Sequence, residues 1–351
     1  MKDIKLGIIG AGKITTNAGR HIDSIKALKD SGVEITAIAD IVPGLAKSVA
    51  KQFGIPNYFE DYRELLKMEE INAITINTST STHKKIAIDV LNSSKHLYVE
   101  KPISSNAEEL EEIIKVTESS GKIFLGGSNG LLQSQMGVFK NLIDKGDLGE
   151  VYMISVDRAS SRDLDYGKQK TQKIGEGISS HSGSHNVEWA LYFLGDPKPV
   201  SVIAKGYYKY NNLSISQDKR NEDDDCCLAI VQFDNGSSFH FKAFRAAPVK
   251  DMYELKIYGD KMSIEYDVHN CYKKKSDDCI RFYRYDKTVG MQSIDPMLKC
   301  GKTHEDMYRH FFDCIRNNKK SISNGERGLV VMKILDAMRE SIANEGKQVF
   351  I

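Results

Sequence analysis

Apolar and polar positions follow one pattern up to about residue 126 and another pattern after it. In the first part, short runs of consecutive apolar residues such as 5–9 and 34–39 are separated by longer stretches with helical spacing. Continuous apolar runs indicate strands buried on both faces, and strands that alternate with helices indicate a parallel sheet. Residues 1–126 are therefore predicted to form an α/β domain with a doubly wound parallel sheet.

The remaining elements of this first domain continue the alternation. After the strands at 5–9 and 34–39, further strands are expected at 58–59, 73–77, 96–99 and 123–126. Helices are expected at 16–31, 44–53, 62–68, 83–93 and 106–119. Each expected strand is followed by a helix on the same pattern, as crossover connections between parallel strands require.

Strands with alternating apolar and polar residues dominate the second part, residues 127–351. A helix expected at 135–145 precedes strands at 151–157, 200–208, 226–233, 237–244, 253–258 and 261–266, and helices at 304–317 and 325–344 end the chain. Asp234-Asn235-Gly236 is typical of a hairpin turn. This pattern predicts an α+β domain with an open, mainly antiparallel sheet. An open sheet exposes one face, which oligomerisation usually covers, so we expect a homodimer or homotetramer.

Composition and charge narrow the class of protein. The 351 residues are 40% hydrophobic, and 49 basic residues nearly cancel 48 acidic ones, so neither a nucleic acid nor a membrane is an expected partner. The N-terminal apolar run is too short for a signal peptide or a membrane span, which favours a cytoplasmic protein. The six cysteines form no C-x-x-C pair and are expected to be reduced thiols. The charge runs at 220–225 and 273–275 are expected to be solvated loops.

The first strand leads into the turn Gly10-Ala11-Gly12-Lys13-Ile14-Thr15. This resembles the dinucleotide fingerprint G-x-G-x-x-G, with Thr15 in the position of the third glycine. Gly10 permits the tight turn, and Gly12 lets the backbone approach a pyrophosphate. The turn therefore predicts a dinucleotide site.

Asp40 ends the second expected strand. An acidic side chain there can accept hydrogen bonds from both ribose hydroxyls of NAD, and its charge repels the 2′-phosphate of NADP. The next residues, Ile41, Val42 and Pro43, supply no arginine to reverse that preference. We therefore expect NAD rather than NADP. The alternative is that Asp40 only caps the helix that follows.

Two further segments follow expected strands of the same sheet. The hydroxyl-rich turn from Thr78 to His83 would contact the adenosine or nicotinamide ribose, or would simply cap the next helix. Lys101 lies just beyond the strand at 96–99, where open α/β sheets bind ligands. The alternative for Lys101 is a solvated loop cation with Glu100 as its ion-pair partner.

His181 and His185 are four residues apart on a helix expected to begin at a Ser179 or Ser180 cap and to end at Leu194. Such a pair can bind metal, but H-S-G-S-H lacks the glutamate of H-E-x-x-H, and no metal site is expected. Both histidines could also be structural. The preceding loop, 158–173, is basic and either borders a pocket for an anionic substrate or is simply exposed.

These features together resemble the glucose–fructose oxidoreductase, inositol dehydrogenase and rhizopine catabolism (Gfo/Idh/MocA) family. The likeness rests on the glycine turn, Asp40, the turn 78–83 and Glu100-Lys101-Pro102, and it continues through almost the whole chain. It implies an NAD-dependent dehydrogenase that transfers a hydride between nicotinamide and a secondary hydroxyl of a sugar, polyol or derivative, phosphorylated and nucleotide-linked sugars included. The cofactor contacts it implies are Gly10, Ala11, Gly12, Lys13, Ile14, Asp40, Ile41, Thr78, Ser79, Thr80, His83, Glu100, Lys101 and Asn129.

The resemblance also implies a catalytic group made of a lysine, an aspartate and a histidine. Lys101 and His185 match two of these, whereas His181 stands where the aspartate is expected. A neutral His181, favoured at a helix N-terminus, would accept a substrate hydrogen bond or act as the base. Two other functions stay open: a glycosidase that retains NAD and oxidises its substrate transiently, and a non-catalytic dinucleotide-binding sensor.

Overall fold

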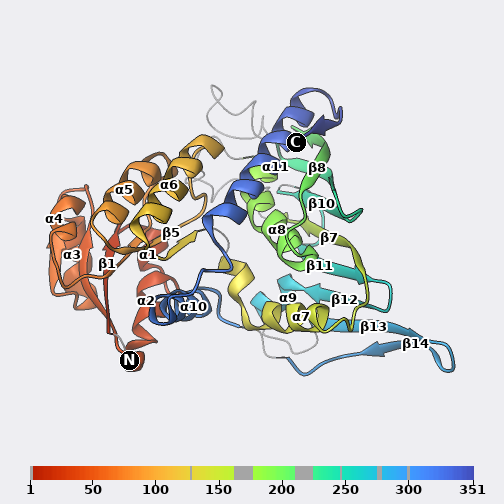
Figure 1. Ribbon diagram of the computed structural model, residues 1–351, viewed down its shortest axis with the longest axis horizontal. Coiled ribbons are helices and arrows are strands. Elements are labelled where there is room, and N and C mark those ends of the chain that lie inside the picture. Colours follow the sequence, from red (N-terminus) through yellow and green to blue (C-terminus); the bar gives the residue numbers. More distant parts are fainter. Residues whose placement is uncertain are drawn as a thin grey trace. The chain divides into compact units, whose positions relative to one another are not determined.

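The computed structural model describes residues 3–126, 129–161, 177–209, 224–245, 247–274, 279–298 and 301–351, without the side chains of 129 and 272–274. The chain divides into two compact units (Figure 1). Unit 1 comprises residues 1–133 and 302–329, and unit 2 comprises residues 134–301 and 330–351. Residues 302–329, expected in the second domain, thus belong to the first. A helical pattern shows that this segment has an apolar face but not which core that face covers.

The sheet of unit 1 has six parallel strands in the order β3-β2-β1-β4-β5-β6. Their order reverses between β1 and β4, which places a ligand crevice at the carboxyl ends of these strands. The predicted doubly wound sheet is confirmed. The strands are β1 (Ile4–Ile9), β2 (Val33–Ala39), β3 (Asn57–Phe59), β4 (Ala73–Ile76), β5 (His96–Val99) and β6 (Phe124–Gly126).

Helices cover both faces of this sheet. Figure 1 shows α5 and α6 side by side on one face and α2 beside α10 on the other. The helices are α1 (Lys13–Thr16), α2 (His21–Lys26), α3 (Leu45–Phe53), α4 (Tyr62–Leu66), α5 (Thr80–Asn92), α6 (Ala107–Ser120) and α10 (Thr303–Asn317), with 3₁₀ turns at Lys29–Ser31 and Asn129–Leu132.

The single helix predicted over 16–31 is wrong. The segment instead forms the end of α1, then α2 and a 3₁₀ turn. Gly19 lies between α1 and α2 with φ of +71°, a left-handed conformation that a continuous right-handed helix cannot contain. The break separates the helix that follows the glycine turn from His21, the first residue of α2.

Helix α10 supplies much of the aromatic core of unit 1. Tyr308, Phe311 and Phe312 are fully buried and belong to one cluster with Ile22 of α2 and Tyr98 of β5. Ring contacts between Tyr98 and Tyr308, with centroids 5.9 Å apart, bring the late helix against the strand that precedes Lys101. A segment from the end of the chain therefore helps to build the site in the first unit.

The sheet of unit 2 has nine strands in the order β14-β13-β12-β11-β7-β10-β9-β8-β15. Only β7 and β10 pair in parallel, so the expected mainly antiparallel sheet is confirmed. Strands β13, β14 and β15 were not predicted, because their only buried residue is Ile280 and they lack a clear alternation. The strands are β7 (Val151–Ala159), β8 (Pro199–Tyr207), β9 (Cys226–Phe233), β10 (Ser238–Phe244), β11 (Met252–Gly259), β12 (Met262–Asp267), β13 (Ile280–Asp286), β14 (Gly290–Ile294) and β15 (Val349–Phe350).

One face of this sheet is covered by helices, among them α8 (Ile178–Leu194), which contacts β7, β9 and β10. Buried side chains such as Val187 and Trp189 anchor α8 on the sheet. On the opposite face, Ile203 and Ile230 are more than 40% exposed. The other helices here are α7 (Ser134–Asp144), α9 (Val268–Lys274) and α11 (Gly325–Ala343).

Two observations bear on the environment of the chain. Cys226, Cys227, Cys279 and Cys314 are buried free thiols. Cys271 is disulfide-bonded, so the expectation of reduced thiols was wrong for this residue. Among the described residues, none of the helices has the length and apolar character needed to cross a bilayer.

Candidate active site

The glycine turn after β1 is closed on one side and open on the other. Gly10 has φ of +102°, and a Cβ added there would lie 2.7 Å from the carbonyl oxygen of Asn77, so only glycine fits. A Cβ added at Gly12 would meet no heavy atom within 4 Å. The chain thus leaves room beside Gly12 for a group to approach the backbone closely, as a pyrophosphate does in this fold.

Thr15, in the position of the third glycine, stabilises the turn from inside. Its buried hydroxyl donates to the Gly10 carbonyl at 2.6 Å and accepts from Asn77 Nδ2 at 3.1 Å. This explains the departure from the fingerprint, because the threonine hydroxyl ties the turn to the end of β4. Sequence reasoning missed Asn77, since an asparagine after a strand has no distinctive pattern.

Asp40 connects the end of β2 to the glycine turn. Its Oδ2 accepts the Ala11 N–H at 2.7 Å, and its Oδ1 accepts the Val42 N–H at 2.9 Å. The alternative that Asp40 caps the next helix is wrong, because Gly44 is the N-cap of α3. Each carboxylate oxygen has a second lone pair, so the same side chain can still accept a ribose hydroxyl.

The turn that precedes α5 presents hydroxyls. Helix α5 begins at Thr80, three residues before the predicted start, with Ser79 as the N-cap. The hydroxyls of Thr78 and Thr82 are 2.8 Å apart, and Thr82 also donates to the Ser79 carbonyl. The cofactor contacts expected from this turn stay predictions.

His83 has a different setting from the hydroxyls of this turn. It is buried, with Nδ1 at 2.9 Å from the Pro102 carbonyl and Nε2 at 3.2 Å from the Thr78 carbonyl. Burial lowers the pKa of His83 below its ordinary value. The ring therefore braces the start of α5 against the segment after Lys101, and a direct cofactor contact for His83 stays a prediction.

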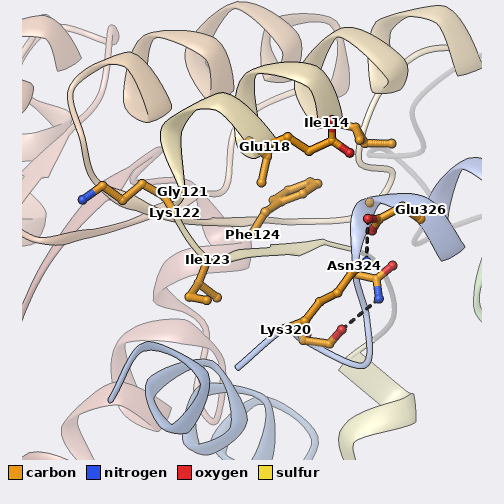
Figure 2. A pocket seen from close by; sticks show the side chains of 12 residues that line it. Ile114, Glu118, Gly121, Lys122, Ile123, Phe124, Lys320, Asn324 and Glu326 are labelled. Atoms are coloured by element: carbon orange, nitrogen blue, oxygen red, sulfur yellow. Dashed lines mark hydrogen bonds and ion pairs between the residues drawn. The ribbon is translucent and has the colours of Figure 1, made fainter. Parts of the chain in front are cut away.

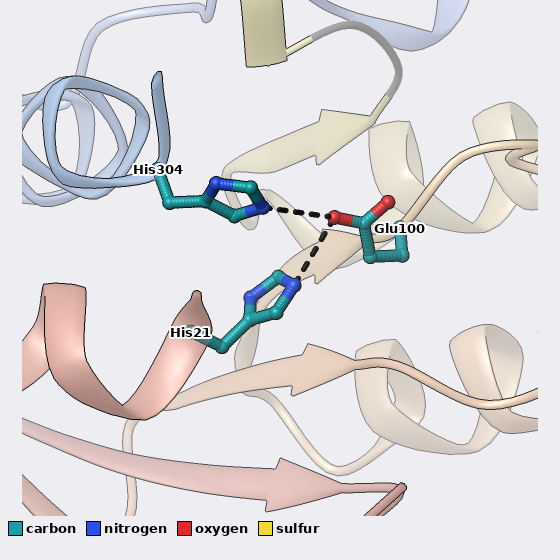
Figure 3. Close-up of side chains that lie close together, drawn as sticks. All are labelled: His21, Glu100 and His304. Carbon is teal, nitrogen blue, oxygen red and sulfur yellow. Dashed lines mark hydrogen bonds and ion pairs between the residues drawn. The ribbon is translucent and has the colours of Figure 1, made fainter. Parts of the chain in front are cut away.

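Glu100 points into the core of unit 1. Its Oε1 accepts His21 Nε2 at 3.1 Å and the Tyr98 hydroxyl at 2.9 Å, and its Oε2 accepts the Lys101 N–H at 2.9 Å. Figure 3 shows His21 and His304 approaching the same carboxylate. Glu100 is thus a buried acceptor rather than part of a solvated loop, and its expected cofactor contact stays a prediction.

Lys101 is half-buried at the carboxyl end of β5, where the sequence placed it. It is joined to Pro102 by a cis peptide bond. The strand before it is buried throughout its last three residues, so the backbone that leads to Lys101 is held in the centre of the sheet. Neighbouring β4 ends beside it, at the turn that begins with Asn77.

Helix α8 carries the two candidate histidines of unit 2. Its N-cap is Gly177 rather than a serine, and the capping side chain is Asp224, which accepts the Ser179 N–H at 3.0 Å and the Ser179 hydroxyl at 2.7 Å. The expectation of a solvated charge run at 220–225 was wrong for Asp224 and Asp225, which are 5% and 9% exposed. Residues 220–223 lie outside the described residues.

His181 is exposed and His185 is half-buried on the first two turns of α8. Next to them, Arg158 Nη1 donates to the Ser182 hydroxyl at 2.6 Å, and the guanidinium lies over the Tyr253 ring at 5.2 Å. Arg158 therefore joins β7 to α8 instead of lying in a basic loop. The other loop residues expected to meet an anionic substrate, 162–173, lie outside the described residues, as does any side-chain description of Asn129.

A cavity of about 300 Å³ lies beside β6 in unit 1 (Figure 2). Apolar side chains such as Ile123 and Phe124 line it, and an ion pair between Lys320 and Glu326, at 2.6 Å, borders it. It lies at the amino-terminal end of β6, whereas doubly wound sheets bind ligands at the carboxyl ends of their strands. We therefore do not assign the candidate active site to this cavity.

The sheet order and the glycine turn are those of a dinucleotide-binding fold. Residues 4–128 match the family model described as "Oxidoreductase family, NAD-binding Rossmann fold". Residues 140–350 match "Oxidoreductase family, C-terminal alpha/beta domain". The chain belongs to the Gfo/Idh/MocA oxidoreductase family, as the sequence resemblance implied.

Relatives and solved structures agree with this assignment. The chain is 25% identical to the uncharacterized oxidoreductase YrbE of Bacillus subtilis, over 97% of this chain and 95% of that protein. It is 24% identical to myo-inositol 2-dehydrogenase of Thermotoga maritima, over 74% of this chain and 73% of that one. It is 26% identical to scyllo-inositol 2-dehydrogenase (NAD(+)) of Bacillus subtilis, with the same two coverages of 74% and 73%.

Two solved structures share the fold over the whole chain. Levoglucosan dehydrogenase in complex with NADH and levoglucosan has a TM-score of 0.84 at 20% identity, covering 100% of both chains. An NAD-binding oxidoreductase from Klebsiella pneumoniae has a TM-score of 0.85 at 19% identity, covering 100% of this chain and 99% of that one. At these identities the likeness establishes the fold.

Proposed function

We propose that this protein is an NAD-dependent dehydrogenase that acts on a secondary hydroxyl of a sugar, a polyol or a derivative of either. The observation that carries the proposal is the position of Lys101 at the carboxyl end of β5, in the same sheet as the glycine turn and Asp40. The relatives named as inositol 2-dehydrogenases support a polyol as the substrate class. Phosphorylated and nucleotide-linked sugars remain within the proposed range.

The cofactor would be held by the glycine turn and Asp40. Gly12 offers open space to the pyrophosphate, and Asp40 offers its remaining lone pairs to the ribose hydroxyls. We infer a preference for NAD because the carboxylate would repel the 2′-phosphate of NADP. The exposed residues that follow, Ile41 and Val42, carry no compensating positive charge. Bound NAD would supply the hydride acceptor.

The acid–base chemistry would fall to Lys101 and His185. An ammonium group beside the substrate hydroxyl stabilises negative charge on that oxygen as its proton leaves. His185 would take or return the proton, since imidazole exchanges protons near neutral pH. His181, one helical turn earlier, would orient the substrate by accepting a hydrogen bond or would share the proton.

The open face of the unit 2 sheet supports a homo-oligomer. Ile203, Leu228 and Ile230 are 44%, 38% and 42% exposed on the adjacent strands β8 and β9, an apolar patch of the kind that often marks a protein interface. We propose a dimer or tetramer of this chain that covers the patch. Light scattering should then give twice or four times the monomer mass, and Ile230→Lys should lower it.

A substrate screen tests the proposed function. The protein would be incubated with NAD or NADP and a panel of inositols, sugars, sugar acids and sugar phosphates, and NADH or NADPH formation would be followed. We expect NADH formation with at least one polyol or sugar and a loss of about a thousandfold in kcat for Lys101→Ala, as for other residues that stabilise a developing charge. Failure to bind either dinucleotide would overturn the proposal. Release of an aryl aglycone without NADH accumulation would instead support the glycosidase alternative.

A further inference from the structure

We propose that His21 and Tyr308 are positioning residues of the active site. They belong to a buried chain of hydrogen bonds that joins the glycine turn to the backbone of Lys101. We call this chain the polar relay. Its side chains are those of Thr15, Asn77, Thr75, Tyr308, His21 and Glu100. The inference deepens the proposed function, because it assigns a role in placing the residues that bind NAD and act on the substrate.

The first half of the polar relay runs from Lys101 into the core. The Lys101 N–H donates to Glu100 Oε2 at 2.9 Å, and Glu100 Oε1 accepts His21 Nε2 at 3.1 Å. On the other side of the same ring, His21 Nδ1 lies 2.7 Å from the Tyr308 hydroxyl. His21 thus uses both ring nitrogens to link the strand end to α10.

The second half runs from α10 to the glycine turn. The Tyr308 hydroxyl donates to Thr75 at 3.3 Å, and Thr75 donates to Asn77 Oδ1 at 3.1 Å. Asn77 Nδ2 then donates to the Thr15 hydroxyl at 3.1 Å, which donates to the Gly10 carbonyl at 2.6 Å. The chain of contacts therefore ends on the residue whose left-handed conformation forms the turn.

The side chains of the polar relay are buried, so the loss of any one hydrogen bond in it is costly in free energy. Thr15, Thr75, His21 and Tyr308 are 0% exposed, and Glu100 is 7% exposed. A buried polar group that loses its partner carries the full cost of desolvation, about 1–3 kcal/mol. Apolar side chains of similar size would fill this core without that risk. We infer that the polar groups specify one arrangement of the turn and the Lys101 backbone, because any shift at one end would break a link.

Glu100 is the acidic member of the polar relay. Burial alone would raise the pKa of Glu100, but the hydrogen bond and charge of His21, together with His304 and Tyr98, outweigh it and hold the pKa below its ordinary value. Burial lowers the pKa of His304 to about 3, so His304 is neutral near pH 7. A permanent carboxylate therefore lies directly behind the Lys101 backbone and holds its N–H.

A metal site formed by His21, Glu100 and His304 is the main alternative, because one ligand atom from each lies within 4.8 Å of the others (Figure 3). The contacts favour the relay. His21 and Glu100 are already hydrogen-bonded to each other, and the Arg20 guanidinium lies 3.4 Å from His304 Nε2. A bound cation would be repelled by that arginine.

The test compares two buried tyrosines that each lose only a hydroxyl. Tyr308→Phe breaks the relay, and Tyr266→Phe is the matched control, because the fully buried Tyr266 accepts a hydrogen bond from Gln135 in unit 2. We expect Tyr308→Phe to lower kcat about tenfold and to weaken NADH binding severalfold, because it removes the buried hydrogen bonds to His21 and Thr75. The control should stay within about twofold in both.

A second comparison separates positioning from general destabilisation. His21→Gln keeps a polar side chain with an N–H that can donate to Glu100, whereas His21→Leu keeps no polar group. We expect the glutamine variant to restore most of the kcat and NADH affinity that the leucine variant loses. If His21→Leu and Tyr308→Phe both keep kcat and NADH affinity within about twofold of the parent, the relay does not position the site.

Amide hydrogen exchange keeps the inference testable if no substrate is found. Tyr308→Phe should speed exchange in peptides covering residues 10–15 and 100–104 together, while Tyr266→Phe should leave both unchanged. Faster exchange at neither end or at one end only would overturn the relay. Stoichiometric zinc in the purified protein that is lost in His21→Leu would replace the relay with a metal site. If Tyr308→Phe speeds exchange at both ends but the parent protein binds no dinucleotide, the proposed function is refuted and the relay is not.

Discussion

The Asp224 carboxylate holds Ser179 at the start of α8 through two hydrogen bonds, to the backbone N–H at 3.0 Å and to the hydroxyl at 2.7 Å. The carbonyl of Asp224 also accepts the Ile178 N–H at 2.9 Å. Gly177 is required beside it, because an added Cβ would lie 1.9 Å from Asp224 Oδ1. Asp224 thus caps the helix that carries His181 and His185 from a segment 45 residues further along the chain.

We predict that Asp224→Ala destabilises the protein by about 2 kcal/mol, since it removes a helix cap and leaves buried partners unpaired. The first turn of α8 should loosen, so the kcat of the proposed reaction should also fall. Asp286→Ala is the control, because the Asp286 carboxylate likewise accepts two hydrogen bonds, both from backbone N–H groups, but lies in an exposed turn. Urea denaturation of both variants measures the difference. If both variants lose the same free energy of unfolding, the buried cap stabilises the protein no more than the exposed turn does.

Gly12→Val should impair dinucleotide binding without loss of fold. The added side chain meets no heavy atom of the chain near its Cβ, so the melting temperature without ligand should stay within a few degrees of the parent. It would occupy the space where a pyrophosphate approaches, so the rise in melting temperature on adding NADH should be lost. Gly137→Ala, also an open position, is the control. An unchanged response to NADH in Gly12→Val would place the cofactor elsewhere.

Asp40→Asn should narrow the preference for NAD over NADP. The amide cannot repel the 2′-phosphate, and it accepts at one oxygen only, so affinity for NADH should fall while affinity for NADPH rises. We expect the ratio of the two dissociation constants to change by about tenfold or more, the size expected for one charged hydrogen bond. Titration of both reduced dinucleotides measures this ratio. A parent protein that prefers NADPH would contradict the role assigned to Asp40.

Stability should fall as the pH drops from about 6.5 towards 5, and His304 should contribute to the fall. Its pKa of about 3 in the folded state lies below the ordinary histidine value of 6.5, so in this range the unfolded chain binds a proton that the folded chain does not. The ring faces His21, the Glu100 carboxylate and the Arg20 guanidinium. Glu100, whose pKa is lowered, loses its contribution only at more acidic pH.

His304→Gln therefore should flatten the pH dependence of unfolding between pH 5 and 6.5. Removing one such proton lowers the slope of the free energy of unfolding against pH by at most about 1.4 kcal/mol per pH unit. Urea denaturation at a series of pH values gives the slope for the parent and the variant. If the free energy of unfolding has the same slope against pH in the parent and the variant, His304 is already charged in the folded state.

Local signals in the sequence predicted the parts of the site that depend on one segment each. The apolar runs placed the six parallel strands, and the run from Gly10 to Thr15 placed the glycine turn. The strand ends placed Asp40 and Lys101 at the same edge of the sheet, because parallel strands share their carboxyl ends. The structure and the family models agree with the fold expected from these signals.

Tertiary contacts decided how those parts are held. The sequence determined which residues lie at the carboxyl ends of the strands, because periodicity is a property of neighbouring positions. It could not show that Glu100 faces His21, that Tyr308 from a late helix joins them, or that Asp224 caps α8, since these partners are 79, 287 and 45 positions apart. Such pairs are chosen when separate elements pack and buried polar groups must find partners. Only the folded chain selects them.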